Sequence, residues 1–288
     1  MNKKIIKLYD TAFAHEDFCG SKIGKNIPNK IVWDRSGNIE DSDIVVFTDS
    51  STHKVNFINK NCKKIAWLIE PPCVSSHNYD YIINNYDKFD FILTHQERLC
   101  DISNKFKILP MWYSMVWPER HGIYEKTKNL SIIASNKRDT TGHILRHDII
   151  NLINNKNVDI DLFGGLTSLG VGYKPIDDKS ESLTPYRFSI VVENDKSPHY
   201  FSEKIIDCLL CGTIPIYWGA DKIGEYFNLN GFFIINSLND IDLILDKLNE
   251  ETYNSMFQYV VENYNIASKY LTVEDYMYDL YLKKLINE

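Results

Sequence analysis

The sequence predicts an α/β protein built from two doubly wound, Rossmann-type domains that face a cleft. Short apolar runs rich in β-formers recur between polar stretches with helical spacing, which is the alternation of a parallel sheet covered by helices. The runs are continuously apolar, as expected for parallel strands buried on both faces. A polar segment at residues 118–129 interrupts the alternation, and 288 residues suffice for one domain on either side of it.

The first half, residues 1–117, forms the first predicted domain. Its expected strands lie at 4–9, 30–33, 43–48, 64–69, 89–94 and 107–111. The segment 118–129 that follows contains many charged and few apolar side chains. We therefore expect this segment to be the linker between the domains.

The second half, residues 130–288, restarts the pattern and forms the second predicted domain. Its expected strands lie at 130–134, 159–163, 188–192, 213–218 and 232–235, with helices at 143–154 and about 202–211 and a mostly helical tail from 241 onward. In doubly wound sheets ligands bind at the carboxyl ends of the strands. The turns from strand to helix are therefore the places where a site is expected.

The composition excludes several classes of protein. Hydrophobic residues make up 44% and charged residues 25% of the chain, which excludes a disordered or collagen-like chain. The formal net charge of −7 argues against a nucleic-acid partner, although it allows a local basic pocket for a phosphate. No window approaches 18 apolar residues, and Lys7 and Asp10 interrupt the N-terminal apolar stretch before a signal peptide forms. We therefore expect a cytoplasmic protein without a membrane span.

The most informative stretch follows the strand at 188–192. This strand delivers Glu193 and Asn194 to its carboxyl end, and after a polar loop Ser202 is placed to cap a helix that starts with Glu203 and Lys204. A lysine in the first turn of a helix is unfavourable unless an anion lies in front of it. A helix N-terminus with a lysine is a good cradle for phosphate, although a solvated lysine on a surface helix is the alternative.

This stretch resembles the donor-binding signature of the α-1,3-fucosyltransferases, glycosyltransferase family 10. The matching positions are Tyr186-Arg187-Phe188, Glu193-Asn194, Tyr200-x-Ser202-Glu203-Lys204, Gly212 and Pro215, with Arg187 and Ser202 as mild departures from Lys and Thr. The resemblance implies a GT-B-like fold with an acceptor-side first domain and a second domain that binds the nucleotide sugar. It also implies the donor-binding residues Asn136, Arg146, Tyr186, Glu193, Asn194, Tyr200, Ser202, Glu203 and Lys204.

A looser match lies upstream of the signature. Ser135-Asn136, Arg146 and the strand end at 160–164 are similar to elements of the same family. Arg146 would then face the donor diphosphate, with Arg138 as its rival. By this resemblance Arg146 and Lys204 neutralise the leaving group, so neither a metal nor another cofactor is expected.

In the first half, Glu70 follows the predicted strand at 64–69 and precedes Pro71 and Pro72, which prevent the strand from continuing. A carboxylate at this edge can serve as a general base if it is partly buried and faces a cleft. The sequence from Trp67 to Pro71 is similar to the family motif that contains the base, although the serine of that motif is absent. A glutamate that only caps a turn is the alternative.

Four other groups of residues could bind a metal or a ligand, but we expect each of them to have a structural role. Asp159-Ile160-Asp161 imitates a metal-binding motif, but the matched strand end already accounts for Asp161. The spacing of His143 and His147 has no third ligand, so we interpret both as surface or cap residues. Cys208 and Cys211 lie in an apolar helix and are interpreted as reduced core thiols. The remaining group is aromatic, and we favour the core over an acceptor-sugar platform for Trp112, Tyr113 and Trp117.

The leading hypothesis from the sequence is an inverting glycosyltransferase with Glu70 as the base. By resemblance the donor is GDP-fucose and the acceptor a hydroxyl group of a glycan. A transferase for another nucleotide sugar and a non-catalytic protein that binds a nucleotide sugar are the alternatives. Glu16, Asp17 and Glu97 are the next candidates for the base.

Overall fold

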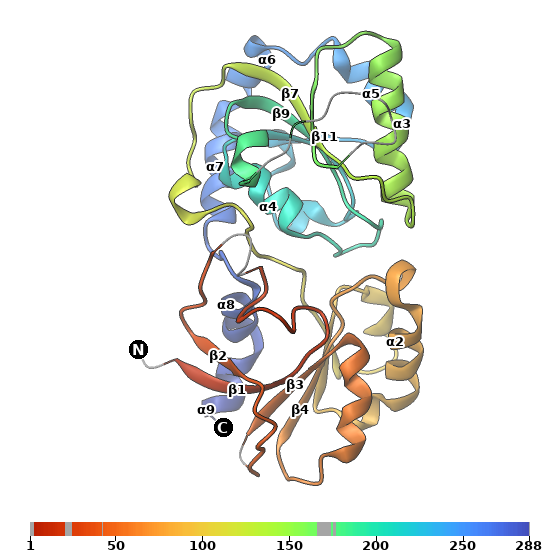
Figure 1. Ribbon diagram of the computed structural model, residues 1–288, viewed down its shortest axis with the longest axis vertical. Coiled ribbons are helices and arrows are strands. Elements are labelled where there is room, and N and C mark those ends of the chain that lie inside the picture. Colours follow the sequence, from red (N-terminus) through yellow and green to blue (C-terminus); the bar gives the residue numbers. More distant parts are fainter. Residues whose placement is uncertain (1–2, 21–24, 42, 166–173, 175–176, 288) are drawn as a thin grey trace.

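The computed structural model describes residues 3–20, 25–41, 43–165, 174 and 177–287. Its strands form two parallel sheets, one above the other along the long axis of the molecule (Figure 1). The first sheet has the order β2-β1-β3-β4-β5-β6, with bounds β1 Lys4–Tyr9, β2 Ile31–Asp34, β3 Ile44–Thr48, β4 Lys63–Trp67, β5 Phe91–Thr94 and β6 Phe106–Ile108. Helix α2 (Pro72–Asn85) connects β4 to β5.

The second sheet has the order β11-β10-β9-β7-β8 and is covered on both faces. Its strands are β7 Lys128–Ile133, β8 Asp161–Phe163, β9 Tyr186–Val192, β10 Ile214–Trp218 and β11 Phe233–Ile234. Helices α3 (Thr141–Asn155) and α5 (Leu238–Leu245) share one apolar core with the sheet. Helices α4 (Glu203–Leu210) and α7 (Phe257–Ala267) pack together on its other side, and α6 (Glu250–Ser255) precedes α7. This is the doubly wound arrangement predicted from the sequence.

Each predicted strand is present, with ends that differ by a few residues. Strand β1 has the predicted bounds, and strands β3, β5 and β10, which have no exposed residue, end where predicted and begin one or two residues later. Such strands must consist of apolar residues without interruption, and this is the signal that the sequence carries. Strand β4 ends at Trp67, so Glu70 lies in the turn before α2 rather than at the last strand residue.

The end of the chain corrects the predicted domain assignment, which placed residues 130–288 together. Helix α8 (Val273–Met277), the π-helical turn Tyr278–Leu282 and helix α9 (Lys283–Asn287) lie beside the first sheet (Figure 1). Asp275 accepts hydrogen bonds from the backbone N–H groups of Asn29 and Lys30, both at 2.9 Å. The apolar side of this segment covers one face of the first sheet, which would otherwise lack a helical layer there.

The predicted linker is only partly a linker. Residues 118–120 form a short 3₁₀ turn, but Lys126 is buried in the second domain. Its ammonium group donates to the backbone oxygens of Thr184 (2.8 Å) and Cys211 (2.7 Å). The chain thus enters the second domain before residue 130.

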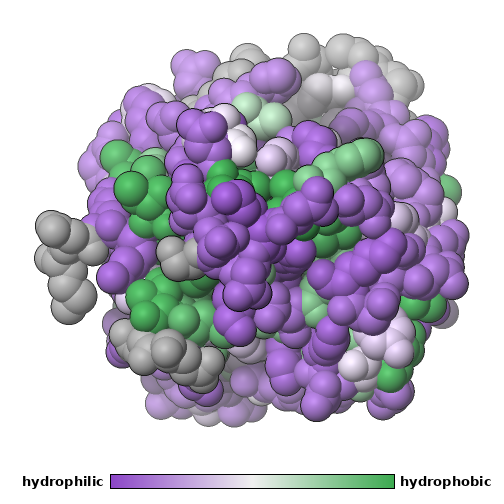
Figure 2. Space-filling model, turned by 90° about the horizontal axis from the view of Figure 1, so that it is seen from below, coloured by the Kyte–Doolittle hydropathy of each residue, from purple (hydrophilic) through white to green (hydrophobic). Residues whose placement is uncertain are grey.

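The end of the molecule below the first sheet is mostly hydrophilic, and its apolar patches are separated by polar side chains (Figure 2). Among the residues that the structure describes, no helix has the length and apolar character needed to cross a membrane.

Candidate active site

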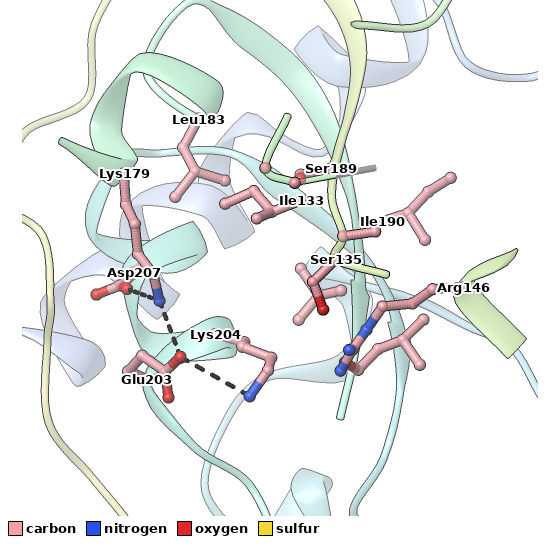
Figure 3. Close-up of a pocket in the computed structure, with 15 residues that line it drawn as sticks. Ile133, Ser135, Arg146, Lys179, Leu183, Ser189, Ile190, Glu203, Lys204 and Asp207 are labelled. Atoms are coloured by element: carbon pink, nitrogen blue, oxygen red, sulfur yellow. Dashed lines mark hydrogen bonds and ion pairs between the residues drawn. The ribbon is translucent and has the colours of Figure 1, made fainter. Parts of the chain in front are cut away.

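A pocket of about 250 Å³ lies at the carboxyl edge of the second sheet, next to the start of α4. Its apolar wall comes from β7 and β9, and its polar side chains converge from several elements (Figure 3). Three of these side chains are cationic: Arg146 on α3, Lys179 in the 3₁₀ turn before β9, and Lys204 on α4. The edge of the sheet and the three cations together form a site suited to a ligand with an anionic group.

Glu193 directly follows β9 at this edge of the sheet and is fully buried. Its carboxylate accepts hydrogen bonds from the backbone N–H of Ser202 at 3.0 Å and from the Ser202 hydroxyl at 2.7 Å. Ser202 is the N-cap residue of α4, as predicted. Glu193 therefore ties the end of β9 to the start of α4 rather than pointing freely into the pocket.

Lys204 lies at the mouth of the pocket, with 27% of its side chain exposed. Its ammonium group donates to the Ser202 hydroxyl at 2.9 Å and lies 3.3 Å from Oε2 of Glu193. The anion that makes a lysine acceptable in this first helical turn is thus already supplied by Glu193. Because Lys204 is more exposed than its partners Ser202 and Glu193, it can still reach a ligand.

Glu203 is buried deeper, in a charged cluster that the sequence did not predict. Lys179 donates to Glu203 at 2.8 Å and lies 3.2 Å from Asp207, and Tyr113 donates to Glu203 at 3.1 Å. Burial acts to raise the pKa of Glu203, but the charges of Lys179 and Lys204 outweigh it and hold that pKa below its usual range. The aspartate within the otherwise apolar run 205–211 was the one sequence signal for this cluster.

Arg146 connects α3 to the end of β9. Its guanidinium donates to the backbone oxygen of Val192 through Nε (3.1 Å) and Nη2, and Nη2 also donates to Oδ1 of Asn194 at 3.0 Å. The helix approaches so closely that a Cβ atom on Gly142 would lie 1.7 Å from the backbone oxygen of Glu193. Only glycine fits at position 142, a requirement that the sequence analysis missed.

Asn136 is exposed and lies in the turn after β7, directly after Ser135, which lines the pocket. Arg138, the rival of Arg146, is exposed in the same turn, and its Nη2 lies 3.2 Å from Nδ1 of His147. Nε2 of His147 in turn contacts the backbone oxygen of Ser135 at 3.0 Å. Arg146 rather than Arg138 therefore lines the pocket.

Tyr186 lies at the amino end of β9, the end opposite Glu193. Its hydroxyl group donates to Asp161, which also forms ion pairs with Lys128 and Lys174. A seven-residue strand is roughly 20 Å long, so the structure does not bring Tyr186 to the pocket. The implied donor-binding role does not fit this position, and Asp161 is occupied by its two lysines.

Tyr200 joins the two domains. Its buried ring lies 4.8 Å, centroid to centroid, from the ring of His95, which follows β5 of the first sheet. The Gln96 side chain donates to the Ser197 hydroxyl at 3.0 Å across the same boundary. The loop between β9 and α4 therefore links the pocket to the carboxyl edge of the first sheet.

Glu70 lies at that edge of the first sheet and is partly exposed. Burial raises the pKa of its carboxyl group, while the positive charge of Lys204 acts to lower it. The charge of Lys204 in the second domain thus acts on the predicted base in the first. In the described part of the chain, the Glu70 carboxylate takes part in no ion pair.

The exposure of the predicted histidine, cysteine and aromatic residues decides their structural roles. Of the two predicted roles for His143 and His147, surface or cap, the surface role is wrong, because 8% and 0% of them are exposed. They are buried because α3 packs against the end of β9 and the turn after β7. Cys208 and Cys211 are buried free thiols, as predicted. Trp112 and Tyr113 belong to the core, whereas Trp117 is partly exposed and carries the Lys25 ammonium over its ring. No group of metal-ligating side chains occurs among the residues described.

Comparison with known proteins extends these observations. Residues 123–281 match the C-terminal domain of glycosyltransferase family 10 (fucosyltransferase). The alpha-(1,3)-fucosyltransferase FucT of Helicobacter pylori is 24% identical over 232 residues, which are 72% of this chain and 48% of that protein. The chain thus spans about half the length of this relative.

Solved structures show the same fold. The crystal structure of an alpha1,3-fucosyltransferase is 19% identical with a TM-score of 0.62, and covers 99% of this chain and 91% of its own. A second crystal structure, described as alpha1,3-fucosyltransferase with GDP-fucose, is 17% identical with a TM-score of 0.57. The match covers 93% of this chain and 90% of the chain in that structure. The architecture is therefore GT-B. Because the family match spans more than half of the sequence, the chain belongs to glycosyltransferase family 10.

Proposed function

We propose that the chain transfers fucose from GDP-fucose to a hydroxyl group of a glycan, with inversion at the anomeric carbon. The observation that carries this proposal is the pocket at the end of β9, where Arg146, Lys179 and Lys204 meet the N-terminus of α4. Membership of the family supports the sugar, and a solved structure of the same fold is described as a complex with GDP-fucose.

In this mechanism Glu70 accepts the proton of the attacking hydroxyl. The new bond forms between the acceptor oxygen and the anomeric carbon, while the bond from that carbon to the diphosphate breaks and GDP leaves. Lys204, Arg146 and the N-terminus of α4 stabilise the charge that develops on the leaving diphosphate. Glu193 and Ser202 hold Lys204 in place for this task.

Arg187, which departs from the family pattern, does not favour another donor. It lies near the amino end of β9, and its Nη2 is 2.6 Å from Oε2 of Glu250. This ion pair is on the side of the sheet away from the pocket. The substitution therefore leaves the lining of the donor pocket unchanged.

The test is the release of nucleoside diphosphate from a panel of nucleotide sugars, GDP-fucose, GDP-mannose and UDP-glucose, with and without glycan acceptors. We expect turnover with GDP-fucose alone. Turnover with another donor would replace the proposed sugar, and GDP binding without turnover of any donor would replace the enzyme by a binding protein.

A further inference from the structure

Asp49, directly after β3, combines three unfavourable features. The residue is only 4% exposed. Its backbone has a φ of +38°, in the left-handed region that residues other than glycine rarely adopt. Its Oδ2 atom has no hydrogen-bond partner within the described part of the chain. Strain of this kind persists only where the surrounding structure imposes it, and it concentrates at functional sites.

The Asp49 carboxyl group acts on the segment that carries Glu70. Strands β3 and β4 are neighbours, with Thr48 opposite Trp67, so the residues after each strand reach the same edge of the sheet (Figure 1). Oδ1 of Asp49 accepts a hydrogen bond from the backbone N–H of Ile69 at 3.0 Å. Burial raises the pKa of Asp49 to about 7, and the backbone of Ile69 and of Glu70 only partly opposes this effect. The peptide N–H immediately before Glu70 in the chain is therefore held by this carboxyl group.

Tyr79, on helix α2, holds the other side of the same peptide segment. Its hydroxyl group donates to the backbone oxygen of Glu70 at 2.8 Å, and the residue is 2% exposed. The main chain at Glu70 is thus held by Asp49 at the N–H of Ile69 and by Tyr79 at the C=O of Glu70. The Glu70 side chain is the part that remains able to reach a substrate.

We propose that Asp49 is a positioning residue that fixes the main chain of Glu70 and thereby aims the Glu70 carboxylate at the attacking hydroxyl. This inference rests on the proposed function, in which Glu70 is the base. A displacement of a reacting group by about 1 Å can cost on the order of 100-fold in rate. The buried and strained residue at position 49 is therefore explained by the order that it imposes at position 70.

Two substitutions test the hydrogen bond without adding backbone strain. D49G removes the acceptor and at the same time relieves the positive φ, because glycine adopts this conformation without penalty. D49N keeps an oxygen acceptor, and asparagine tolerates the left-handed region. We expect D49G to lower kcat for GDP-fucose turnover by about 10- to 100-fold, with an unchanged KM for GDP-fucose and an unchanged Kd for GDP. We expect D49N to keep most of the rate.

The double variant D49G/E70Q tests whether Asp49 acts through Glu70. In the E70Q background D49G should cause no further loss of kcat, because the effects of two residues that work as one unit are not additive. Melting temperatures of all variants show whether each is folded, and D49S replaces D49G if the latter does not fold.

Equal rates for D49G and D49N, a loss of GDP affinity in D49G, or additive losses in the double variant would overturn the inference. A slow E70Q with a D49G of wild-type rate overturns this inference alone. An E70Q of wild-type rate overturns the role of Glu70 as the base and the inference together.

Discussion

The carboxyl edges of the two sheets differ in how their charges are arranged. At the edge of the first sheet, Glu70 and Asp49 are carboxyl groups whose pKa values are raised by burial, to about 7 for Asp49, and neither forms an ion pair within the described ranges. At the edge of the second sheet, Lys179 and Lys204 are each paired with carboxylates. The first edge is suited to accept a proton, and the second to hold an anion without a large net charge of its own.

In the proposed function, the two halves of the transfer reaction fall to two separate sheets. A carboxylate whose pKa is raised by burial is a stronger proton acceptor than one held in an ion pair. A phosphate site needs cations held in fixed positions, and carboxylates such as Glu193 provide that support. Substitutions on the two sides should therefore affect different steps.

The largest effect is expected for E70Q. If Glu70 is the base, glutamine keeps the shape of the side chain but cannot accept the proton, so kcat should fall by about 10²- to 10⁴-fold. The affinity for GDP, measured by calorimetry, should remain that of the wild type because the donor pocket lies in the other domain. A normal rate would redirect the search to Glu16, Asp17 and Glu97.

K204A tests the carboxyl edge of the second sheet, where the donor is proposed to bind. Loss of one phosphate contact should remove about 2–4 kcal/mol of transition-state stabilisation, measured as a fall in kcat/KM for GDP-fucose with a matching loss of GDP affinity. Lys204 is 27% exposed, so the melting temperature should change little. K196A is the control, because Lys196 lies in the same domain and pairs with Asp221 away from the pocket. Unchanged turnover in K204A would remove Lys204 from the donor site.

G142A tests the close packing of α3 against the end of β9 at the edge of the second sheet. A methyl group at position 142 would overlap the backbone oxygen of Glu193 at 1.7 Å, so α3 must move away from the end of β9. We expect a loss of about 1–3 kcal/mol in the free energy of unfolding together with weaker GDP binding. G165A is the matched control, because a Cβ atom there has no neighbour within 4 Å. Equal stability of the two variants in urea would contradict this packing.

The pH dependence of stability should distinguish the carboxyl groups whose pKa is raised from the one whose pKa is lowered. Burial raises the pKa of Asp49 and of Glu274, in the first domain, to about 7, so the folded state binds more protons than the unfolded chain between about pH 4 and 7. Stability from these groups therefore falls as the pH rises through that window. Glu203 has the opposite sign, because its lowered pKa stabilises the fold above the unfolded pKa and loses this effect in acid.

E274Q should flatten this profile by about 1–3 kcal/mol between pH 5 and 7.5, measured by urea unfolding at each pH. The glutamine oxygen can still accept the hydrogen bonds from the Cys19 backbone and the Trp33 indole. The exposed Glu119 gives the control variant E119Q, whose profile should match the wild type. An unchanged slope in E274Q would show that Glu274 does not titrate in this range.

The smallest effect is expected from chelation. Because Arg146 and Lys204 are proposed to stabilise the leaving diphosphate, turnover should be the same with and without EDTA. Turnover that is abolished by EDTA and restored by Mn²⁺ would contradict this division of labour. It would then be necessary to find carboxylates other than Asp161, which is held by Lys128 and Lys174.

The sequence by itself determined the local features of this protein. A parallel strand buried on both faces requires an uninterrupted apolar run, and a helix start requires a capping side chain, so the strands and the Ser202 cap of α4 were predicted from neighbouring residues alone. The adjacency of Glu193, Ser202 and Lys204 follows from the same local rules, because the end of a strand and the start of the next helix meet at one edge of the sheet.

Only the tertiary structure decided which distant groups meet. The partners of Glu203 are Lys179 and Tyr113, 24 and 90 residues away, and no periodic pattern encodes such a pairing. The same holds for Asp49 beside the Glu70 peptide and for the C-terminal helices on the first sheet. These contacts arise when apolar faces are buried together, and the polar groups trapped at their borders must then find partners by proximity in space rather than along the chain.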